Sequence, residues 1–366
     1  MNNIFFIDKN VLTYEDLLDY INFDTSNIIL SDVEIFVFNE IKRLSGGSVE
    51  NIDDLINKIK SNNLSLELNT SGTTGKPKVI IHTVESITKN IKVGLKHSNL
   101  IWGLTYYQGK MAFYQVIFQS LFNQSTLVNL YGYTFDVVGD RINKFEVNHI
   151  SATPTFYRML SSSNEKYNKI TQVTLGGESS TEHIILLLKD IFPNAKIKNI
   201  YASTETASLF ISDGFNFKIS EKYKNKIQII EDVLHVHTDL LGEINDDNVK
   251  NDWYNTQDIV EFINENEFKF IGRKNSEINI SGFKVNPIKI ESVLYTLPYV
   301  LNCRVFSKKN SVTGNILCCD VVLKHNVKKN IIKEDLKIVL DRVEVPSIIN
   351  FVDNIEINEN VKIIRS

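Results

Sequence analysis

Residues 68–78 read Leu-Asn-Thr-Ser-Gly-Thr-Thr-Gly-Lys-Pro-Lys and run directly into the apolar residues 79–81. Four of these eleven residues carry a hydroxyl group, two are glycine and two are lysine. Backbone N–H groups, hydroxyl donors and mobile positive charges together suit the binding of a polyanion. We therefore interpret the stretch as a phosphate-binding loop. The alternative, a flexible linker, does not account for the two lysines or for the apolar run on each side.

The spacing of this loop differs from that of the Gly-x-x-x-x-Gly-Lys-Ser/Thr loop, which opens a helix. Gly72 and Gly75 are three residues apart, and Pro77 follows Lys76. Proline lacks the N–H that a helix interior needs, so it would stop a helix at this point. We expect the loop to connect two strands, since an apolar strand-like segment follows it directly.

Length and composition limit the classes of protein. The 366 residues are 43% hydrophobic, which allows a large core, and a chain of this length usually splits into more than one domain. A formal net charge of -4 argues against a nucleic-acid partner. The three cysteines, Cys303, Cys318 and Cys319, are too few and too clustered for a disulfide framework. They predict a reduced, cytoplasmic setting.

The hydropathy pattern predicts neither a signal peptide nor a membrane span. Residues 1–10 lack a basic head and a long apolar run, and no stretch approaches the roughly eighteen apolar residues of a spanning helix.

Strands and helices are expected to alternate after the loop. The apolar patterns predict a helix over 82–96, a strand over 100–107, a helix over 113–122 and a strand over 126–130. This alternation indicates parallel β-α-β units with helices on both faces of a twisted sheet, which is an α/β fold. Ligands in such folds bind beyond the carboxyl ends of the strands, so we expect functional residues there.

The first sixty residues are expected to form a small opening layer. The pattern predicts a strand over 4–7 and a helix that Thr13 caps. Residues 28–30 and 33–38 cluster like strands, and residues 51–59 have the pattern of a short amphipathic helix.

Residues 199–207, Asn-Ile-Tyr-Ala-Ser-Thr-Glu-Thr-Ala, follow a predicted strand and combine three groups that an ATP site needs. Tyr201 offers a ring that can stack on adenine, Thr204 offers a hydroxyl donor to the α-phosphate, and Glu205 offers a carboxylate to Mg²⁺. The alternative is a buried tyrosine and a solvated glutamate on an unrelated turn.

Three other stretches indicate the same kind of site. Residues 174–181 contain two adjacent glycines, which let a flat ring approach the backbone because no Cβ intervenes; a plain tight turn is the alternative. Arg273 follows Gly272 and would offer five fixed donors to ribose or phosphate oxygens. Lys362 lies in the C-terminal stretch Asn-Glu-Asn-Val-Lys-Ile-Ile-Arg, where a solvated tail lysine is the alternative.

These stretches together resemble the motifs of the AMP-forming adenylate synthetases, the family of acyl-CoA synthetases, peptide-synthetase adenylation domains and luciferases. Residues 68–78 resemble the family's phosphate loop, 199–207 its Tyr-Gly-x-Thr-Glu motif and 268–291 the junction between its domains. Residues 253–262 lie where relatives carry Thr-Gly-Asp, and residues 358–365 lie where they carry Asn-Gly-Lys-x-x-Arg.

The chain departs from the family pattern at four positions and at its start. Ala202, Gln257 and Val361 stand where the family has glycine, and Asn275 occupies the hinge position, which is usually Asp or Lys. The 67 residues before the loop are also fewer than in relatives, which implies a shortened N-terminal region.

The resemblance implies a large N-terminal domain with mainly parallel sheets flanked by helices, joined by a hinge to a small C-terminal α+β domain. We place the boundary after Arg273. Residues 1–273 would then form the large AMP-binding domain, and residues 274–366 would form the small mobile domain with the catalytic lysine.

The resemblance also implies which residues contact the substrates. Lys362 would bridge the carboxylate and the α-phosphate, while Thr204 and Glu205 would contact the α-phosphate and Mg²⁺, with Thr70 as a further Mg²⁺ contact. Asp258 would accept the ribose hydroxyls. The residues expected to bind the nucleotide or coenzyme are Thr70, Ser71, Gly72, Thr73, Thr74, Gly75, Lys76, Lys78, Gly176, Gly177, Glu178, Tyr201, Asp258, Arg273 and Gly282.

The implied reaction is the ATP-dependent activation of a carboxylic acid as an acyl-adenylate, with release of pyrophosphate, followed by transfer to the thiol of coenzyme A. A carrier-protein phosphopantetheine is the alternative acceptor. A catalytically degenerate nucleotide-binding relative and an unrelated ATP-dependent kinase or ligase are the alternative classes. Residues 109–115 contain no acidic side chain where relatives that activate α-amino acids place an aspartate, so a non-amino acid is favoured.

Overall fold

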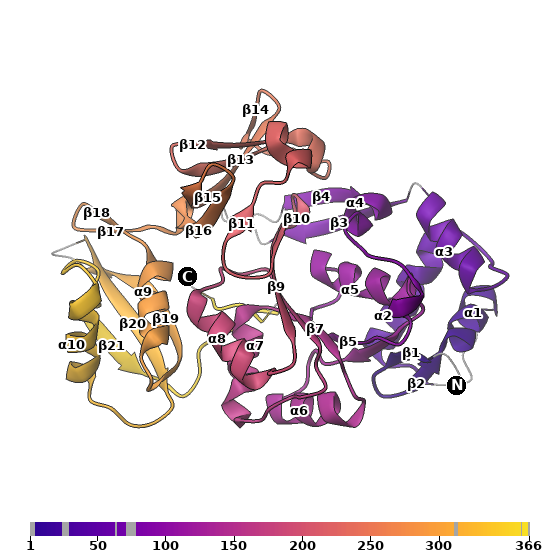
Figure 1. The fold of residues 1–366 in the computed structure, drawn as a ribbon, viewed down its shortest axis with the longest axis horizontal. Coiled ribbons are helices and arrows are strands. Elements are labelled where there is room, and N and C mark those ends of the chain that lie inside the picture. The colour runs from indigo at the N-terminus through magenta and orange to yellow at the C-terminus, as the bar shows by residue number, and fades with distance from the viewer. Residues whose placement is uncertain are drawn as a thin grey trace.

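A computed structural model describes residues 4–23, 29–62, 64–70, 78–310, 314–359 and 361–364. This part of the chain forms a large domain built on two sheets and a smaller domain at the C-terminal end, drawn in orange to yellow in Figure 1. Within the described ranges, no helix is both long and apolar enough to cross a membrane.

An eight-stranded sheet with the order β10-β9-β8-β7-β5-β6-β1-β2 forms the centre of the large domain. The strands from β9 to β1 are parallel to their neighbours, whereas the edge strands β10 and β2 are antiparallel. The predicted α/β fold with parallel units is therefore confirmed. The strands are β1 (Ile4–Ile7), β2 (Val11–Thr13), β5 (Ile101–Leu104), β6 (Thr126–Asn129), β7 (His149–Ala152), β8 (Gln172–Leu175), β9 (Lys196–Ser203) and β10 (Ala207–Ser212).

Two hydrophobic cores lie on opposite faces of this sheet. In β6, Leu127 belongs to one core and Val128 to the other, because successive side chains of a strand point to opposite faces. Helices α1 to α5 contribute to the first core and α6 to α8 to the second. The helices are α1 (Tyr14–Phe23), α2 (Asp32–Ser45), α3 (Ile52–Ser61), α4 (Val84–Thr88), α5 (Met111–Leu121), α6 (Phe135–Lys144), α7 (Pro154–Leu160) and α8 (Glu182–Ile191).

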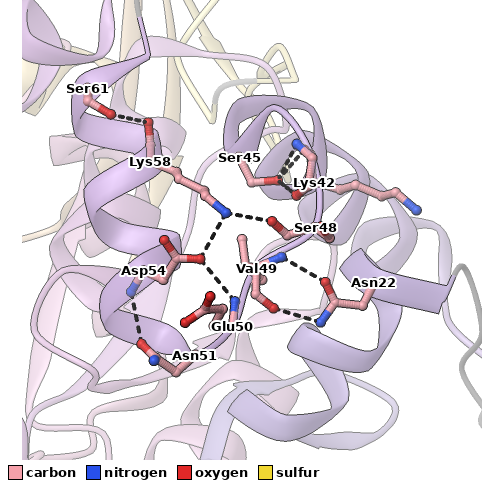
Figure 2. A network of polar contacts seen from close by, with 11 residues as sticks. Asn22, Lys42, Ser45, Ser48, Val49, Glu50, Asn51, Asp54, Lys58 and Ser61 are labelled. Atoms are coloured by element: carbon pink, nitrogen blue, oxygen red, sulfur yellow. Dashed lines mark hydrogen bonds and ion pairs between the residues drawn. The ribbon is translucent and has the colours of Figure 1, made fainter.

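Polar contacts join the N-terminal helices at the connection between α2 and α3 (Figure 2). The side chain of Asn22 forms two hydrogen bonds with the backbone of Val49, at 2.9 and 2.8 Å. The Lys58 ammonium lies 2.6 Å from the carbonyl oxygen of Ser48 and 2.9 Å from the carboxylate of Asp54. These bonds satisfy backbone groups of the α2–α3 connection and tie α1 and α3 to it.

The predicted strand over residues 33–38 is wrong, because these residues lie in α2. The Ser31 hydroxyl accepts a hydrogen bond from the Glu34 N–H, and the Glu34 carboxylate accepts one from the Ser31 N–H. This reciprocal pair starts a helix. The apolar residues continue at helical spacing from Val37 to Ile41, so the pattern is that of a helix once the later residues are included.

Two other predictions for the opening half differ from the structure. Residue 28 lies outside the described residues, and residues 29–30 do not form a strand. The helix predicted over 82–96 is limited to the five residues of α4, because His82 still belongs to a strand and Gly94 adopts an extended conformation that a helix excludes.

The hairpin of β3 (Ser65–Thr70) and β4 (Lys78–Thr83) flanks the predicted phosphate loop, which agrees with a loop between two strands. The loop itself, residues 71–77, lies outside the described residues. A second, antiparallel sheet has the order β11-β16-β15-β13-β12, with β14 beside β15. Its strands are β11 (Phe217–Lys218), β12 (Ile227–Ile230), β13 (Val233–His237), β14 (Val249–Lys250), β15 (Trp253–Asn264) and β16 (Glu267–Arg273).

The small domain has a hydrophobic core of its own. Ile290, Val305 and Leu336 are buried in this core and come from a helix, a strand and a second helix. The elements are β17 (Ile278–Ile280), β18 (Phe283–Val285), α9 (Pro287–Thr296), β19 (Val300–Asn310), β20 (Gly314–Leu323), α10 (Lys329–Val339) and β21 (Ile348–Phe351). The predicted α+β arrangement of a separate smaller domain is confirmed. The boundary after Arg273 stays a prediction.

Candidate active site

The carboxyl ends of the parallel strands open onto a cavity of about 650 Å³ between the two domains. The strand order reverses at β5, since β6 lies on one side of β5 and β7 on the other. Open α/β sheets bind ligands in the crevice at such a reversal. Tyr106, just after β5, and Ser151, in β7, both line the cavity. The cavity therefore lies where the topology alone predicts a ligand.

A C-terminal tail from the small domain brings Lys362 into this cavity. The Thr153 hydroxyl donates to the carbonyl oxygen of Val361 at 2.8 Å, and the Ile363 N–H donates to the Glu178 carboxylate at 3.3 Å. These two bonds hold the tail on both sides of the lysine. Figure 1 shows this end of the chain between the small domain and α8.

The turn after β8 leaves room for the lysine. Gly177 has φ +80°, and a Cβ at this position would lie 3.3 Å from Cε and 3.4 Å from Nζ of Lys362. Removal from water lowers the pKa of the Lys362 ammonium, while the nearby Glu178 carboxylate partly opposes this shift. The structure therefore brings together the glycine turn at residues 176–177 and Lys362, which the sequence predicted as separate parts of the site.

Both oxygens of the Glu178 carboxylate accept backbone hydrogen bonds. One accepts from Ile363 of the tail, and the other accepts from the N–H of Thr155 at 3.0 Å, in the first turn of α7. Glu178 was predicted as a nucleotide-binding residue. It lines the cavity, but its contacts fix the tail to the large domain.

Asp258, Arg273 and Tyr201 form one connected group on the opposite wall. Arg273 Nε donates to one oxygen of the buried Asp258 at 2.7 Å, and the Tyr201 hydroxyl donates to the other at 2.7 Å. The Asp258 charge raises the pKa of the Arg273 guanidinium. The Tyr201 ring is stacked on Phe270 at a centroid distance of 4.3 Å. An adenine base would have to stack on the other face of Tyr201.

Thr204 and Glu205 lie in the turn between β9 and β10 and line the cavity. His82 holds this turn: one ring nitrogen lies 2.6 Å from the Thr204 carbonyl oxygen and the other 2.5 Å from the Ser86 hydroxyl. Burial lowers the pKa of His82, which favours the neutral ring; in this form Nε2–H donates to the Thr204 carbonyl and Nδ1 accepts from the Ser86 hydroxyl. His82, which stands four residues after the end of the predicted loop, was not among the predicted site residues.

The donor set suits Mg²⁺ held together with phosphates. Mg²⁺ in phosphate-transfer sites takes one or two carboxylates and completes its shell with phosphate oxygens and water. Glu205 supplies one carboxylate to the cavity, and the described residues contain no cluster of three or more His, Cys, Asp or Glu that could hold a metal without the nucleotide.

Lys78 and Gly282, which were predicted to bind the nucleotide or coenzyme, are not free to do so in the same way as the other cavity residues: one is ion-paired and the other lies outside the cavity. Lys78 lines the cavity, but its ammonium lies 2.5 Å from the carboxylate of Asp246, whose side chain is 1% exposed. Gly282 lies in the exposed turn between β17 and β18 and does not line the cavity. Ser71, Gly72, Thr73, Thr74, Gly75 and Lys76, and the side chain of Thr70, lie outside the described residues.

Gln257 and Val361, which stand at family glycine positions, both keep the backbone conformation that glycine favours. Their φ angles are +64° and +52°, in the left-handed region. Asn199 is a further cavity residue that was not among the predicted site residues: it is 3% exposed, and its Nδ2 has no hydrogen-bond partner among the described residues. Its position before Tyr201 in the quoted motif was the available signal.

Comparisons with known proteins agree with this arrangement. A sequence model of the AMP-binding enzyme family matches residues 19–230, and one of the AMP-binding enzyme C-terminal domain matches residues 289–362. The chain is 28% identical over 331 residues to 4-hydroxybutyrate–CoA ligase 1 of Metallosphaera sedula, covering 78% of this chain and 58% of that protein. It spans between 50% and 64% of the length of this ligase and of two other curated acyl-CoA ligases or synthetases.

Solved structures show the same fold. The o-succinylbenzoate CoA synthetase of Bacillus subtilis, in complex with its acyl-adenylate intermediate, matches with a TM-score of 0.69 at 18% identity, covering 100% of this chain and 94% of that chain. The same enzyme with ATP and magnesium matches with a TM-score of 0.63 at 18% identity, covering 92% and 81%.

The fold and the cavity thus define a two-domain α/β protein of the adenylate-forming class. The chain belongs to the AMP-binding enzyme family.

Proposed function

We propose that this protein activates a carboxylic acid with ATP, forms an acyl-adenylate with release of pyrophosphate, and transfers the acyl group to the thiol of coenzyme A with release of AMP. The observation that carries this proposal is the position of Lys362, which reaches from the small domain into the cavity at the strand ends of the large domain. The similarity to CoA ligases in sequence, and to a synthetase with a bound acyl-adenylate in structure, supports it.

The proposed chemistry needs little covalent work from the protein. The acid carboxylate attacks the α-phosphorus, and pyrophosphate leaves. Negative charge spreads over the phosphate oxygens in the transition state, so positioning and cationic groups lower the barrier. Lys362 would bring an ammonium to the carboxylate and α-phosphate oxygens, and Mg²⁺ between Glu205 and the phosphates would neutralise further charge.

The nucleotide is assigned to the wall that Asp258, Arg273 and Tyr201 form. Asp258 and Arg273 would contact the ribose, because a carboxylate can accept from both hydroxyls and a guanidinium can donate to their oxygens. Asn199, whose buried Nδ2 has no hydrogen-bond partner among the described residues, would meet the adenine edge, while its Oδ1 accepts from the Ser180 hydroxyl. The residues of the loop, from Thr70 to Lys76, are assigned to the β- and γ-phosphates.

The acid is assigned to the opposite end of the cavity, which Tyr106, Lys110, Met111, Ala112 and Gln115 line. This set contains no carboxylate to pair with an ammonium group. It supports a non-amino acid as the substrate.

Transfer to the thiol would require Lys362 to leave, since the tail fills the space beside the reacting carbon. We assign this movement to rotation of residues 274–366 against residues 1–273 about the hinge at Asn275. Coenzyme A is the proposed acceptor, because relatives of this chain include several CoA ligases. A carrier-protein phosphopantetheine is the alternative acceptor, and the experiment below distinguishes it from coenzyme A.

A degenerate nucleotide-binding protein is less well supported. Gln257 and Val361, the substitutions that suggest degeneration, retain the left-handed backbone of the glycines they replace. The local geometry that glycine provides in relatives is therefore present without glycine.

ATP–pyrophosphate exchange against a panel of carboxylic acids tests the proposal. Exchange with at least one acid, followed by thioester formation when coenzyme A is added, is the expected result. If exchange is followed by loading of a phosphopantetheinylated carrier protein and not by thioester formation with coenzyme A, the acceptor is the carrier protein. Nucleotide binding with no exchange would indicate the degenerate relative, and release of ADP would indicate an unrelated enzyme.

A further inference from the structure

The acid end of the cavity has polar groups that the proposed chemistry does not use. The Tyr106 hydroxyl and the Ser151 hydroxyl lie 3.0 Å apart, and both residues line the cavity. Gln115, in the second turn of α5, donates from Nε2 to the Ser208 hydroxyl at 3.0 Å. Within the described part of the chain, the Gln115 amide has no other hydrogen-bond partner, so its oxygen is available to a ligand.

These groups belong to other elements than the nucleotide wall: Ser151 lies in β7, Tyr106 just after β5, and Gln115 in α5. Lys110, at the start of α5, forms an ion pair of 2.8 Å with Glu359 of the tail, which places the start of this helix beside the tail. Asp258 and Arg273 belong to the antiparallel sheet on the opposite side. A carboxylate held at Lys362 would therefore direct the rest of the acid toward α5 and β7.

The space for the acid is small. The whole cavity of about 650 Å³ is an ordinary volume for a single small-molecule site, and here it must also hold the nucleotide. A volume shared with a nucleotide favours a short acid over a long hydrocarbon chain. Met111 and Ala112 supply the apolar contact that a few methylene groups need.

The charge of this end is balanced within the protein. Lys110 is paired with Glu359, and no carboxylate side chain comes from the described residues of α5 or β7. Among the described residues of α5 and β7, neither an ammonium group nor a second carboxylate on the substrate meets an unpaired opposite charge; the Arg158 guanidinium, which also lines the cavity, lies over the Tyr295 ring of α9. The groups that remain are the neutral hydroxyls and the neutral amide. Burial raises the pKa of Tyr106 to about 12, so its hydroxyl keeps its proton.

We infer that the acid is short and carries an uncharged hydrogen-bonding group, a hydroxyl or a carbonyl, on the part of the molecule distal to its carboxylate. This inference rests on the proposed function and specifies its substrate class. A pocket that contains buried polar groups rejects an analogue that cannot bond to them, because those groups lose their water without a replacement. An unbranched hydrocarbon acid of equal size is therefore the poor substrate.

Matched pairs of acids test this inference by ATP–pyrophosphate exchange. The pair 4-hydroxybutyrate and pentanoate, and the pair 3-hydroxybutyrate and 3-methylbutanoate, differ by a hydroxyl in place of a methyl group at equal size. We expect kcat/KM to be higher for a hydroxy acid by about tenfold or more in at least one pair. Octanoate, which is too long, is expected to give no exchange.

Two variants and a matched control locate the preference. Tyr106→Phe and Gln115→Leu remove one polar group each and should move the hydroxy-to-hydrocarbon ratio toward one. Gln119→Leu makes the same change one turn later on α5, where the side chain contacts the Lys92 carbonyl and not the cavity, and should leave the ratio unchanged. Thermal melting with and without ATP verifies that each variant is folded and binds nucleotide.

The outcomes separate the two proposals. Equal or better use of the hydrocarbon member of both pairs by the wild type would overturn the substrate inference alone, and so would a ratio that neither Tyr106→Phe nor Gln115→Leu alters. The absence of exchange with every acid would overturn the proposed function and the inference with it.

Discussion

Gln257 and Val361 show how single residues can retain a geometry at an energetic cost. A non-glycine residue in the left-handed region is destabilised by about 1–2 kcal/mol, and a β-branched side chain is especially unsuited to it. Such strain persists only where the surroundings impose it. Here Val361 stands directly before Lys362 and Gln257 directly before Asp258, so each strained position lies next to a residue of the proposed site.

Gln257→Gly should therefore stabilise the large domain. Glycine removes the steric cost at φ +64° but adds conformational freedom to the unfolded chain, so the net gain should be about 0.5–1 kcal/mol. Urea unfolding followed by tryptophan fluorescence measures it, because Trp253 lies on the same strand. Gln257→Ala is the control, since it removes the same side chain but keeps the strained angle. A gain in the alanine variant equal to that in the glycine variant would contradict the explanation.

Lys362→Ala should abolish most adenylation while leaving nucleotide affinity nearly unchanged. The ammonium is a pre-positioned charge for the transition state, and loss of such a group typically lowers the rate about 10²- to 10³-fold. Exchange kinetics and calorimetric titration with ATP measure the two effects separately. Lys337→Ala, on the exposed face of α10, is the control. Normal turnover in Lys362→Ala would remove the lysine from the mechanism.

Two histidines, His82 in β4 and His149 in β7, are kept neutral in the folded protein. Burial lowers the pKa of His149 to about 4 and lowers that of His82. The unfolded chain binds these protons near pH 6.5, but the folded chain does not, so stability must fall as the pH drops below about 6.5.

His149→Gln should flatten this dependence. The amide keeps a polar group beside Asn148, but it takes up no proton. Urea midpoints measured at intervals from pH 7 to pH 4.5 should decline less steeply in the variant than in the wild type. Parallel curves for the two proteins would show that His149 does not contribute to acid sensitivity.

At the scale of elements, local sequence predicted much of the fold and failed in identifiable places. Asn51 caps α3 through its side chain, and the helix predicted over residues 51–59 is present. The error at residues 33–38 arose because β-branched and aromatic residues resemble a strand over a short window. The capping pair of Ser31 and Glu34 was the stronger local signal.

The parts of the site that could not be predicted depend on contacts between distant residues. His82 and Thr204 are 122 positions apart, and Lys78 and Asp246 are 168 positions apart. A motif predicts which residue types a reaction needs, but it does not indicate which partner fixes each one. This is why the motifs selected Lys362, Asp258 and Arg273 and did not anticipate that Lys78 is neutralised by a buried carboxylate.

At the scale of the whole molecule, contacts of different strength join the two domains. The buried Arg158 guanidinium lies 3.9 Å from the buried Tyr295 ring centroid, a cation–π contact between α7 and α9 of a kind that contributes about 2 kcal/mol when it is desolvated. The partly exposed ion pair of Lys110 and Glu359 is of a kind that contributes between nothing and about 1 kcal/mol. The small domain must break these contacts to rotate, as the proposed second half-reaction needs.

Lys274→Pro should uncouple the two half-reactions. Arg273 has φ −118° and ψ 133°, the extended conformation that a residue before proline prefers, and Lys274 is the first residue of a 3-10 helix, where proline is tolerated. The substitution therefore suits the present arrangement and restricts rotation at the proposed hinge. We expect ATP–pyrophosphate exchange to stay within about twofold of the wild type, because Lys362 remains in the cavity, and thioester formation to fall by an order of magnitude or more, since a fixed φ raises the barrier to reorientation.

Lys274→Ala separates this effect from the loss of the lysine charge, because it keeps the backbone free and should support both half-reactions. Single-turnover measurements with preformed acyl-adenylate report the second step directly. If Lys274→Pro forms the thioester as fast as Lys274→Ala, rotation at this position is not part of the cycle, and the thiol must reach the acyl-adenylate with the tail in place. If exchange falls together with thioester formation, the proline has distorted the junction, and the hinge must be placed elsewhere than between Arg273 and Ser276.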